Sequence, residues 1–553
     1  MPGGLLNLVS YGNQNIILNG NPSKTFFKST YAKYSNFGLQ KFRIDYNGLR
    51  TLRASEESRF TFKVPRYGDL LMDTYLVVNL PTIWSPIYPP QSNNSNWKPY
   101  EFRWIDNLGT QMIKHITFSV GGQIIQRFSG QYMHVLAQRE LTNTERDLYN
   151  RMTGNIAELN DPANALGRGG NYPNAYYTDD AAGPEPSIRG RKLYIPLNAW
   201  FTTTSQMAFP LVSLQYNELH IEVTMRPVRE LMTIISPTAD TNNRVQPNFV
   251  SPLEALYRFL QPPPDERLDI LSYTDTRTNW NADVHLISTY CFLGEDEVRM
   301  FAEKEQTYLF KEIHEHRHEN ITGSRRVSLS SSGLVAGYSW CFQRSDSYLR
   351  NQWSNYTNWE YSKELPSNLI NAPTTGGISV PNIDIGLGPG TDAGETAGIP
   401  NSNFITGTFS VRNQKDILEN WALIVDGKYR ENVLDAGILS YVEKYLHSAG
   451  DAPEGIYVYS FSLKNSLRDL QPSGAMNMSK FSNIEFEIKT YLPPLDPNAE
   501  TFVICDPETE ETIGINKPVW RIYDYNYDLV IFEERYNVLK LSSGNAGLAF
   551  ARA

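Results

Sequence analysis

Apolar and polar residues alternate in several short segments of the chain, which is the pattern of a β-strand with one buried face. In the segment 481–491, FSNIEFEIKTY, the side chains of Ile484, Phe486 and Ile488 point to one side and polar side chains point to the other. The segment 216–225, YNELHIEVTM, shows the same alternation. Both segments are predicted to be strands that line a core.

These two segments belong to a set of three sequence matches that occur in the same order in both halves of the chain. KLYIPL (192–197) precedes the segment 216–225, and VYSFSL (458–463) precedes the segment 481–491. Tyr216 lies 19 residues after Leu197, and Phe481 lies 18 residues after Leu463. Earlier, FSVGGQ (118–123) resembles LIVDGK (423–428), and each is typical of a strand that turns at a glycine. The shared order predicts one β unit present twice, although amphipathic strands of a single large all-β protein would also give such matches.

The composition favours β structure, because 33 Tyr, 25 Phe, 33 Pro and 37 Gly among 553 residues suit strands and turns better than long helices. One or two helices are predicted at 130–154, where apolar residues have near-helical spacing and the segment ends at a glycine. The stretches 154–190 and 371–402 predict surface insertions. The prolines at 262–264 predict a linker, and QPSG at 471–474 predicts the end of a strand.

The formal net charge of -10 gives the chain as a whole no attraction for a phosphate backbone, so nucleic acid is not an expected partner. The start of the sequence lacks a secretory signal, and no segment approaches the roughly 20 apolar residues needed to cross a bilayer. The three unclustered cysteines, Cys291, Cys341 and Cys505, fit a reducing compartment. These features predict a soluble protein made in the cytosol.

The histidine-rich segment KEIHEHRHENITG is the strongest candidate for a chemical site. His314, Glu315 and His318 satisfy the zinc-protease pattern, in which a helix brings two imidazoles to one face and the glutamate acts as base. The extended form of this pattern needs a glycine and a third histidine, but the chain has Ile321 and Ser324 at those positions. A zinc protease is therefore not predicted.

On a strand, His314, His316 and His318 would share one face, as in the metal-binding jelly-roll enzymes called cupins. Glu319 follows the histidines too closely for that pattern, and Val458 stands where its later histidine is required. The preferred interpretation is a charged, solvated strand face, so no catalytic, cofactor-binding or metal-binding residue is predicted.

Two other features give no chemistry. Adjacent carboxylates such as Glu533 and Glu534 are interpreted as ordinary surface residues, because without geometry they cannot be assigned as acid and base. The sequence GLGPG at 386–390 lacks the third glycine of a dinucleotide-binding loop, and it is predicted to be a surface loop.

Several stretches closely resemble the major capsid proteins of nucleocytoplasmic large DNA viruses. They carry the elements YGNQ, GNP and TFFK near the start of the chain and GIYVYSFSL followed by QPSG near its end. The matching stretches, in the family's order, are 3–38, 66–81, 210–223, 455–474 and 534–551. The insertions 154–190 and 371–402 match no obvious motif of the family.

The resemblance implies an all-β double jelly-roll, with two tandem eight-stranded sandwiches, a few short helices and long surface loops. The expected organisation is an N-terminal arm at 1–25, a first jelly roll at 26–260, a linker at 261–281 and a second jelly roll at 282–553. The arm would lie beneath the first jelly roll and contact neighbours or an inner layer.

The resemblance also implies a structural function without enzymatic activity. Three copies would form a homotrimeric capsomer with a pseudo-hexagonal outline, which tiles the icosahedral shell of a large double-stranded DNA virus. Its implied partners are neighbouring capsomers, minor capsid and penton proteins and, through the arm, an inner membrane layer, in a virion assembled in the host cytoplasm. The alternatives are a penton-like or glycan-binding jelly-roll virion protein and a cupin-like metalloenzyme.

Overall fold

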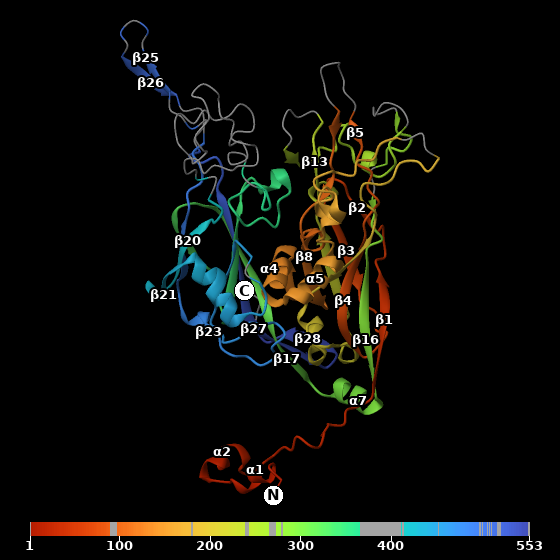
Figure 1. Cartoon of the computed structure of the whole chain (residues 1–553), viewed down its shortest axis with the longest axis vertical. Coiled ribbons are helices and arrows are strands. Elements are labelled where there is room, and N and C mark those ends of the chain that lie inside the picture. The colour runs from red at the N-terminus through yellow and green to blue at the C-terminus, as the bar shows by residue number, and fades with distance from the viewer. Residues whose placement is uncertain are drawn as a thin grey trace.

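The computed structural model describes residues 2–550 except for 89–96, 178–180, 238–242, 265–271, 278–279, 365, 367–410, 412–413, 452, 497–498, 500–501, 506, 508, 510 and 517–520. Two β-sandwiches stand side by side, and the long strands of both run mainly along the long axis of the molecule (Figure 1). The N-terminal segment extends beyond one end of this pair.

The first sandwich has two antiparallel sheets with the strand orders β1-β16-β4-β10 and β3-β12-β8-β9. The strands of the first of these sheets are β1 (Phe37–Asp45), β16 (His285–Leu293), β4 (Leu70–Asn79) and β10 (Lys192–Pro196). Those of the second sheet are β3 (Ser58–Lys63), β12 (Leu219–Met225), β8 (Ile113–Val120) and β9 (Gln123–Ser129).

The second sandwich has the strand orders β17-β27-β19-β22 and β18-β24-β20-β21, again with antiparallel neighbours. The strands of its first sheet are β17 (Gln306–Ile321), β27 (Tyr527–Ser542), β19 (Leu334–Arg344) and β22 (Ile456–Ser460). Those of its second sheet are β18 (Ser324–Ser328), β24 (Ile484–Thr490), β20 (Leu418–Val425) and β21 (Lys428–Asp435).

The two sandwiches have the same topology. When the eight main strands of each are numbered in chain order, the sheets have the orders 1-8-3-6 and 2-7-4-5 in both sandwiches. The three predicted sequence matches fall on strands with equal positions, namely β8 with β20, β10 with β22 and β12 with β24. The predicted duplication and the predicted double jelly-roll are therefore confirmed.

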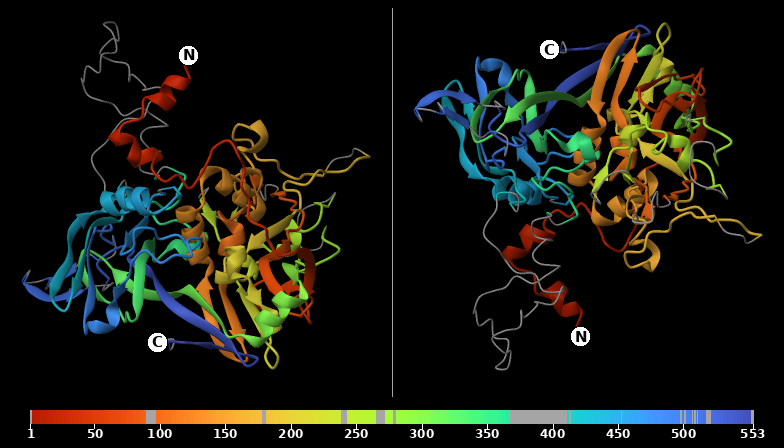
Figure 2. Two further views of the ribbon diagram at one scale, coloured as in Figure 1. Left: turned by 90° about the horizontal axis from the view of Figure 1, so that it is seen from below. Right: turned by 90° about the horizontal axis from the view of Figure 1, so that it is seen from above.

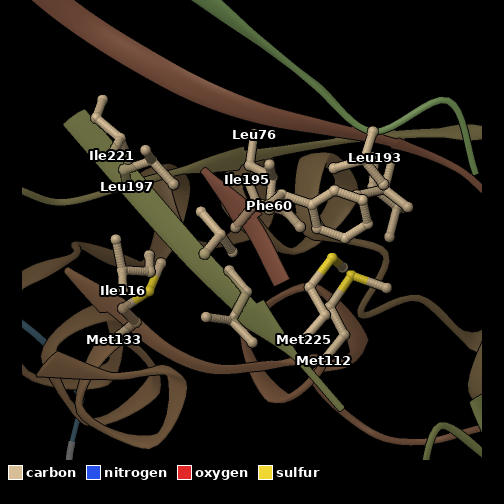
Figure 3. Packing of buried hydrophobic residues seen from close by; sticks show 14 of the residues in the cluster. Phe60, Leu76, Met112, Ile116, Met133, Leu193, Ile195, Leu197, Ile221 and Met225 are labelled. Carbon is tan, nitrogen blue, oxygen red and sulfur yellow. The ribbon is translucent and has the colours of Figure 1, made fainter. Parts of the chain in front are cut away.

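The core of each sandwich follows from the alternation in its strands. In β3, every second residue is buried, and Phe60 packs between the sheets with Leu76, Ile195 and Ile221 (Figure 3). In the second sandwich, the rings of Trp340 and Trp421 stack with centroids 5.1 Å apart. The polar side chains of these strands mostly face outward.

The predicted helices at 130–154 are present as α4 (Gly130–Glu140) and α5 (Asn143–Thr153). The Ser129 side chain caps α4 by accepting a hydrogen bond from the backbone N–H of Tyr132. Gly154 ends α5 in the left-handed conformation with φ +81°. Figure 1 shows both helices between the two sandwiches.

The insertion 154–190 is only partly a surface loop. It begins with the short helix α6 (Ala157–Asn160), and Leu159 and Ala163 are buried. The second insertion, 371–402, and the GLGPG loop at 386–390 lie outside the described residues.

The expected domain boundary differs from the observed strand pairing. Strand β16, which the predicted boundary at 282 placed in the second jelly roll, pairs with β1 and β4 of the first sandwich. Trp280, inside the predicted linker, is also buried in the core of the first sandwich. We propose that the boundary lies instead at α7 (Glu295–Glu303), which connects β16 to β17.

The predicted end of strand β22 (Ile456–Ser460) was wrong. The strand ends at Ser460, well before the QPSG sequence at 471–474, so this sequence does not terminate it. Residues 456–459 are all buried. The segments η11 (Ile438–Val442) and α9 (Glu443–His447) of the same sandwich contact this strand, and Ile456 also packs in one cluster with residues of the first sandwich.

Candidate assembly surfaces

Helix α4 of the first sandwich packs on the outer face of the sheet β17-β27-β19-β22. The ring of Tyr132 lies 5.4 Å from that of Phe532 on β27, measured between centroids. The side-chain amide of Gln131 donates to the Cys341 sulfur at 3.4 Å. Apolar residues of the second sandwich, such as Phe532 and Ile456, therefore belong to one continuous core with residues of the first sandwich.

A buried ion pair lies at the centre of this interface. The guanidinium of Arg139 on α4 is 2.6 Å from a carboxylate oxygen of Glu534 on β27, and the side chain of each is 1% exposed. The Tyr132 hydroxyl donates to the same oxygen at 3.1 Å, and the Lys311 ammonium is 3.7 Å from the other oxygen. The prediction that Glu533 and Glu534 are ordinary surface residues is wrong, since both are buried.

The charges around Glu534 compensate for its burial. Burial by itself raises the pKa of this carboxyl, but the neighbouring charges of Arg139 and Lys311 outweigh it, so that the pKa is lowered. Removing Arg139 would take away the nearest charged partner of the buried Glu534 carboxylate, and breaking a buried pair in this way typically costs about 3–5 kcal/mol. The two sandwiches are thus held together by an apolar contact with a charged centre.

The edge strand β9 of the first sandwich lies beside the edge strand β17 of the second. The backbone N–H of Ser129 donates to the carboxylate of Glu315 at 2.8 Å. The Gln126 side chain donates to the backbone carbonyl of Lys311 at 3.3 Å. Helix α4 and strand β9 thus form a central part of the surface through which the first sandwich contacts the second, and other contacts, such as that of Trp200 with Phe310, extend it.

The histidine-rich segment lies in β17, so the strand geometry is the relevant one. His316 Nε2 is 3.2 Å from a carboxylate oxygen of Glu533, and the His314 and His316 side chains are only 12% and 14% exposed. The expected solvated face is therefore largely buried. Burial also lowers the pKa of His318.

The zinc-protease arrangement is not assembled. On a strand, adjacent residues point to opposite faces, and Glu315 accepts a hydrogen bond from the first sandwich while His314 and His316 face the other way. Among the residues that the structure describes, no group of three or more His, Cys, Asp or Glu side chains is placed to hold a metal ion.

The N-terminal segment makes few contacts with its own chain. No residue from 2 to 36 is buried. Its two short helices are α1 (Leu5–Val9) and α2 (Ile16–Asn19), and they expose Leu8, Ile17 and Leu18 at 75–87%. The apolar clusters of this arm, LLNLV and IIL, were not recognised from the sequence. Within the described part of the chain, no helix is long and apolar enough to span a bilayer.

Two jelly rolls of equal topology in one chain define the class of double jelly-roll proteins. Two family profiles match the chain, "Major capsid protein N-terminus" over residues 25–255 and "Large eukaryotic DNA virus major capsid protein" over residues 297–547. The chain thus belongs to the double jelly-roll major capsid proteins of large eukaryotic DNA viruses.

Individual relatives and solved structures agree with this assignment. The chain is 26% identical to the major capsid protein of Phaeocystis pouchetii virus and 24% identical to that of Paramecium bursaria Chlorella virus 1, with 100% of both chains covered in each case. A chain of a quasi-atomic capsid model of PBCV-1 virus has a TM-score of 0.59 at 18% identity, covering 96% of this chain and 100% of the other. The Faustovirus major capsid protein has a TM-score of 0.58 at 12% identity, covering 94% and 93%.

Proposed function

We propose that three copies of this chain form a pseudo-hexagonal capsomer that tiles the icosahedral shell of a large double-stranded DNA virus. The observation that carries the proposal is the equal topology of the two sandwiches. Three chains with two equivalent units each give six similar units around a threefold axis. Such a unit packs in a flat layer, because its outline is close to a hexagon.

The proposed role is structural and involves no catalytic step. The buried polar groups described above pair with one another, either between the sandwiches, as Arg139 does with Glu534, or within the second sandwich, as His316 does with Glu533. The named relatives are capsid proteins. A cupin-like metalloenzyme is disfavoured because, among the described residues, His314, His316 and their acidic neighbours do not form a group of three or more side chains placed to hold a metal ion.

The partners of the capsomer follow from its exposed surfaces. The N-terminal arm exposes apolar side chains to solvent, which is unfavourable. We therefore expect them to be covered by neighbouring capsomers, minor capsid or penton proteins, or an inner membrane layer. We propose that the protein belongs to the capsid shell of the virion and that it is synthesised and assembled in the host cytoplasm. A penton-like or glycan-binding virion protein would share the fold but not the regular tiling.

The test is a mass measurement combined with negative-stain imaging of the purified full-length chain. The proposal expects a particle of three times 63.0 kDa with a hexagonal outline, and ordered arrays at high concentration. A monomer or dimer at micromolar concentration would contradict it. A variant lacking residues 2–25 is expected to keep the trimer but to lose contacts between capsomers.

A further inference from the structure

Each sandwich has a helical segment directly after its fifth strand, but the two segments are covered to very different extents. In the first sandwich, α4 follows β9 and is almost entirely buried against the second sandwich. In the second, the segments η11 (Ile438–Val442) and α9 (Glu443–His447) follow β21 and expose large apolar side chains. Tyr441 is 60% exposed, Tyr445 87% and Leu446 60%.

Strand β21 shows the same difference from its counterpart β9. Both are edge strands of the sheet in which they lie. While β9 lies beside β17 of the second sandwich, β21 has Tyr429 and Val433 exposed at 50% and 54%. The second sandwich thus has a free surface made of β21 and the segment 438–447, which we call the helix surface.

The complementary surface is the outer face of the sheet β1-β16-β4-β10, which we call the sheet surface. It corresponds in topology to the sheet that α4 covers within the chain. Leu39 on β1 and Tyr194 on β10 are 54% and 40% exposed. Tyr75 and Ile287, a cross-strand pair on β4 and β16, are half-buried between them.

We propose that the helix surface of one chain binds the sheet surface of a second copy, repeating between chains the contact that α4 and β9 make within the chain. The proposal rests on the proposed trimer and specifies which surfaces hold it together. One chain carries one surface of each kind, so that every contact is heterologous, and a rotation that closes such contacts gives a ring. With two equivalent units per chain, a near-sixfold ring closes after three copies.

The chemistry of the two surfaces fits this arrangement. Leu446 stands nine residues after Gly437, as Arg139 stands nine residues after Gly130 at the start of α4. On the facing side, β16 presents Ile287 on its outer face, whereas β27 presents Glu534 on the equivalent face. The Arg139–Glu534 pair of the contact within the chain would therefore have Leu446 and Ile287 as its apolar counterparts between chains. Arg43, which lies beside Ile287 on the same face, keeps its own ion pairs with Asp45 and Asp283.

An exposed apolar cluster of this kind also needs an occupant. Tyr441, Val442, Tyr445 and Leu446 lie within six residues of one another, and contiguous apolar surface of this kind on a soluble protein marks an interaction site. The sheet surface offers aromatic and apolar residues such as Tyr75 and Ile287 to this cluster, with the charged residues Lys41, Arg43 and Asp73 beside them. A second copy is the partner that the internal contact already specifies.

The proposal is tested first by cysteine cross-linking in the full-length protein with Cys505, the exposed cysteine, changed to serine. A variant with both Leu446→Cys and Ile287→Cys is expected to give disulfide-linked dimers and trimers under mild oxidation, and neither single variant is expected to do so. A trimer that forms normally without any cross-link from the double variant would overturn the assigned surfaces while leaving the trimer itself established. A wild-type protein that is monomeric would instead contradict the proposed function.

A second test uses a charge at the helix surface. Leu446→Glu is expected to shift the protein from the trimer to a folded monomer, raising the dissociation constant by at least a hundredfold. Val250→Glu is the matched control, because Val250 is an apolar residue that is 91% exposed elsewhere. A trimer that persists with Leu446→Glu, as expected if a minor capsid protein covers this surface, would overturn the proposal, and so would equal dissociation by both variants. Circular dichroism distinguishes dissociation from unfolding, because a folded monomer keeps the β-sheet spectrum. Leu446 is 60% exposed, so the variant is expected to stay folded.

Discussion

The outer sheets of the two sandwiches have the same strand order and opposite environments. The sheet β17-β27-β19-β22 is covered by α4 of the same chain and carries a buried ion pair, whereas the sheet β1-β16-β4-β10 exposes apolar side chains such as Leu39 and Tyr194. Views along the long axis show the two sandwiches in contact through α4 and β9 (Figure 2). Of the two equivalent sheets that the duplication creates, only β17-β27-β19-β22 is therefore covered by a helix of the same chain, within the described residues.

The largest effect is expected from breaking the ion pair in the covered sheet. Arg139→Ala leaves Glu534 buried without its main partner and should lower the free energy of unfolding by about 3–5 kcal/mol. Arg326→Ala is the control, because its pair with Glu487 is largely exposed and should contribute less than about 1 kcal/mol. Urea unfolding followed by tryptophan fluorescence measures both. Equal losses for the two variants would show that the interface charge has no special importance.

The next effect concerns how closely α4 is packed compared with the segment 438–447. A Cβ at Gly130 would lie 2.0 Å from the Thr110 carbonyl oxygen, so Gly130→Ala forces the helix away and should destabilise the protein by about 1–3 kcal/mol. The nearest atom to a Cβ at Gly437 is the Asp435 carboxylate at 3.1 Å, and Gly437→Ala should change stability by less than about 1 kcal/mol. Thermal unfolding of the two variants distinguishes them. A larger loss at Gly437 would contradict the assigned difference in packing.

A smaller effect is expected from acid. The pKa of Glu534 is lower in the folded protein than its ordinary value of 4.5, so its stabilising contribution is present above that value and is lost as the pH falls through the folded pKa. The free energy of unfolding should therefore decrease below about pH 4.5, and Glu534→Gln should make this decrease shallower. Unfolding measured in urea at a series of pH values checks the prediction. A pH dependence that is unchanged in the variant would exclude this carboxylate as its source.

The smallest effect is expected at the histidines of β17. His314→Ala should leave the metal content of the purified protein unchanged, because no group of three or more possible metal ligands is assembled among the described residues, those around His314 included. Elemental analysis of the wild type and the variant measures this directly. Stoichiometric metal in the wild type that disappears in the variant would support the cupin-like alternative instead.

Much of the fold could be predicted from the sequence because its information is local. The alternation at Leu219, Ile221 and Val223 of β12 and at Ile484, Phe486 and Ile488 of β24 marks equivalent strands of both units, and their order reveals the duplication. Near-helical spacing and the closing Gly154 made the helices at 130–154 recognisable for the same reason.

The assembly surfaces could not be predicted in this way, because they depend on which elements meet in space. Glu534 looks like a surface carboxylate until α4 brings Arg139 to it from a position 395 residues earlier in the chain. Strand β22 is buried on both faces, because η11, α9 and residues of the first sandwich pack against the face that does not line the core. Strand β16 follows three prolines and still belongs to the first sandwich, since pairing with β1 and β4 decides its place.

We propose above that the contact between the sandwiches within one chain is repeated between chains. Electron cryomicroscopy of the purified capsomer tests it most directly. We expect a trimer in which residues 438–447 of one chain cover Tyr75 and Ile287 of the next. All six sandwiches of this trimer should be related by a near-sixfold rotation. A trimer whose chains meet through other surfaces, with the sheet β1-β16-β4-β10 left facing solvent, would contradict it.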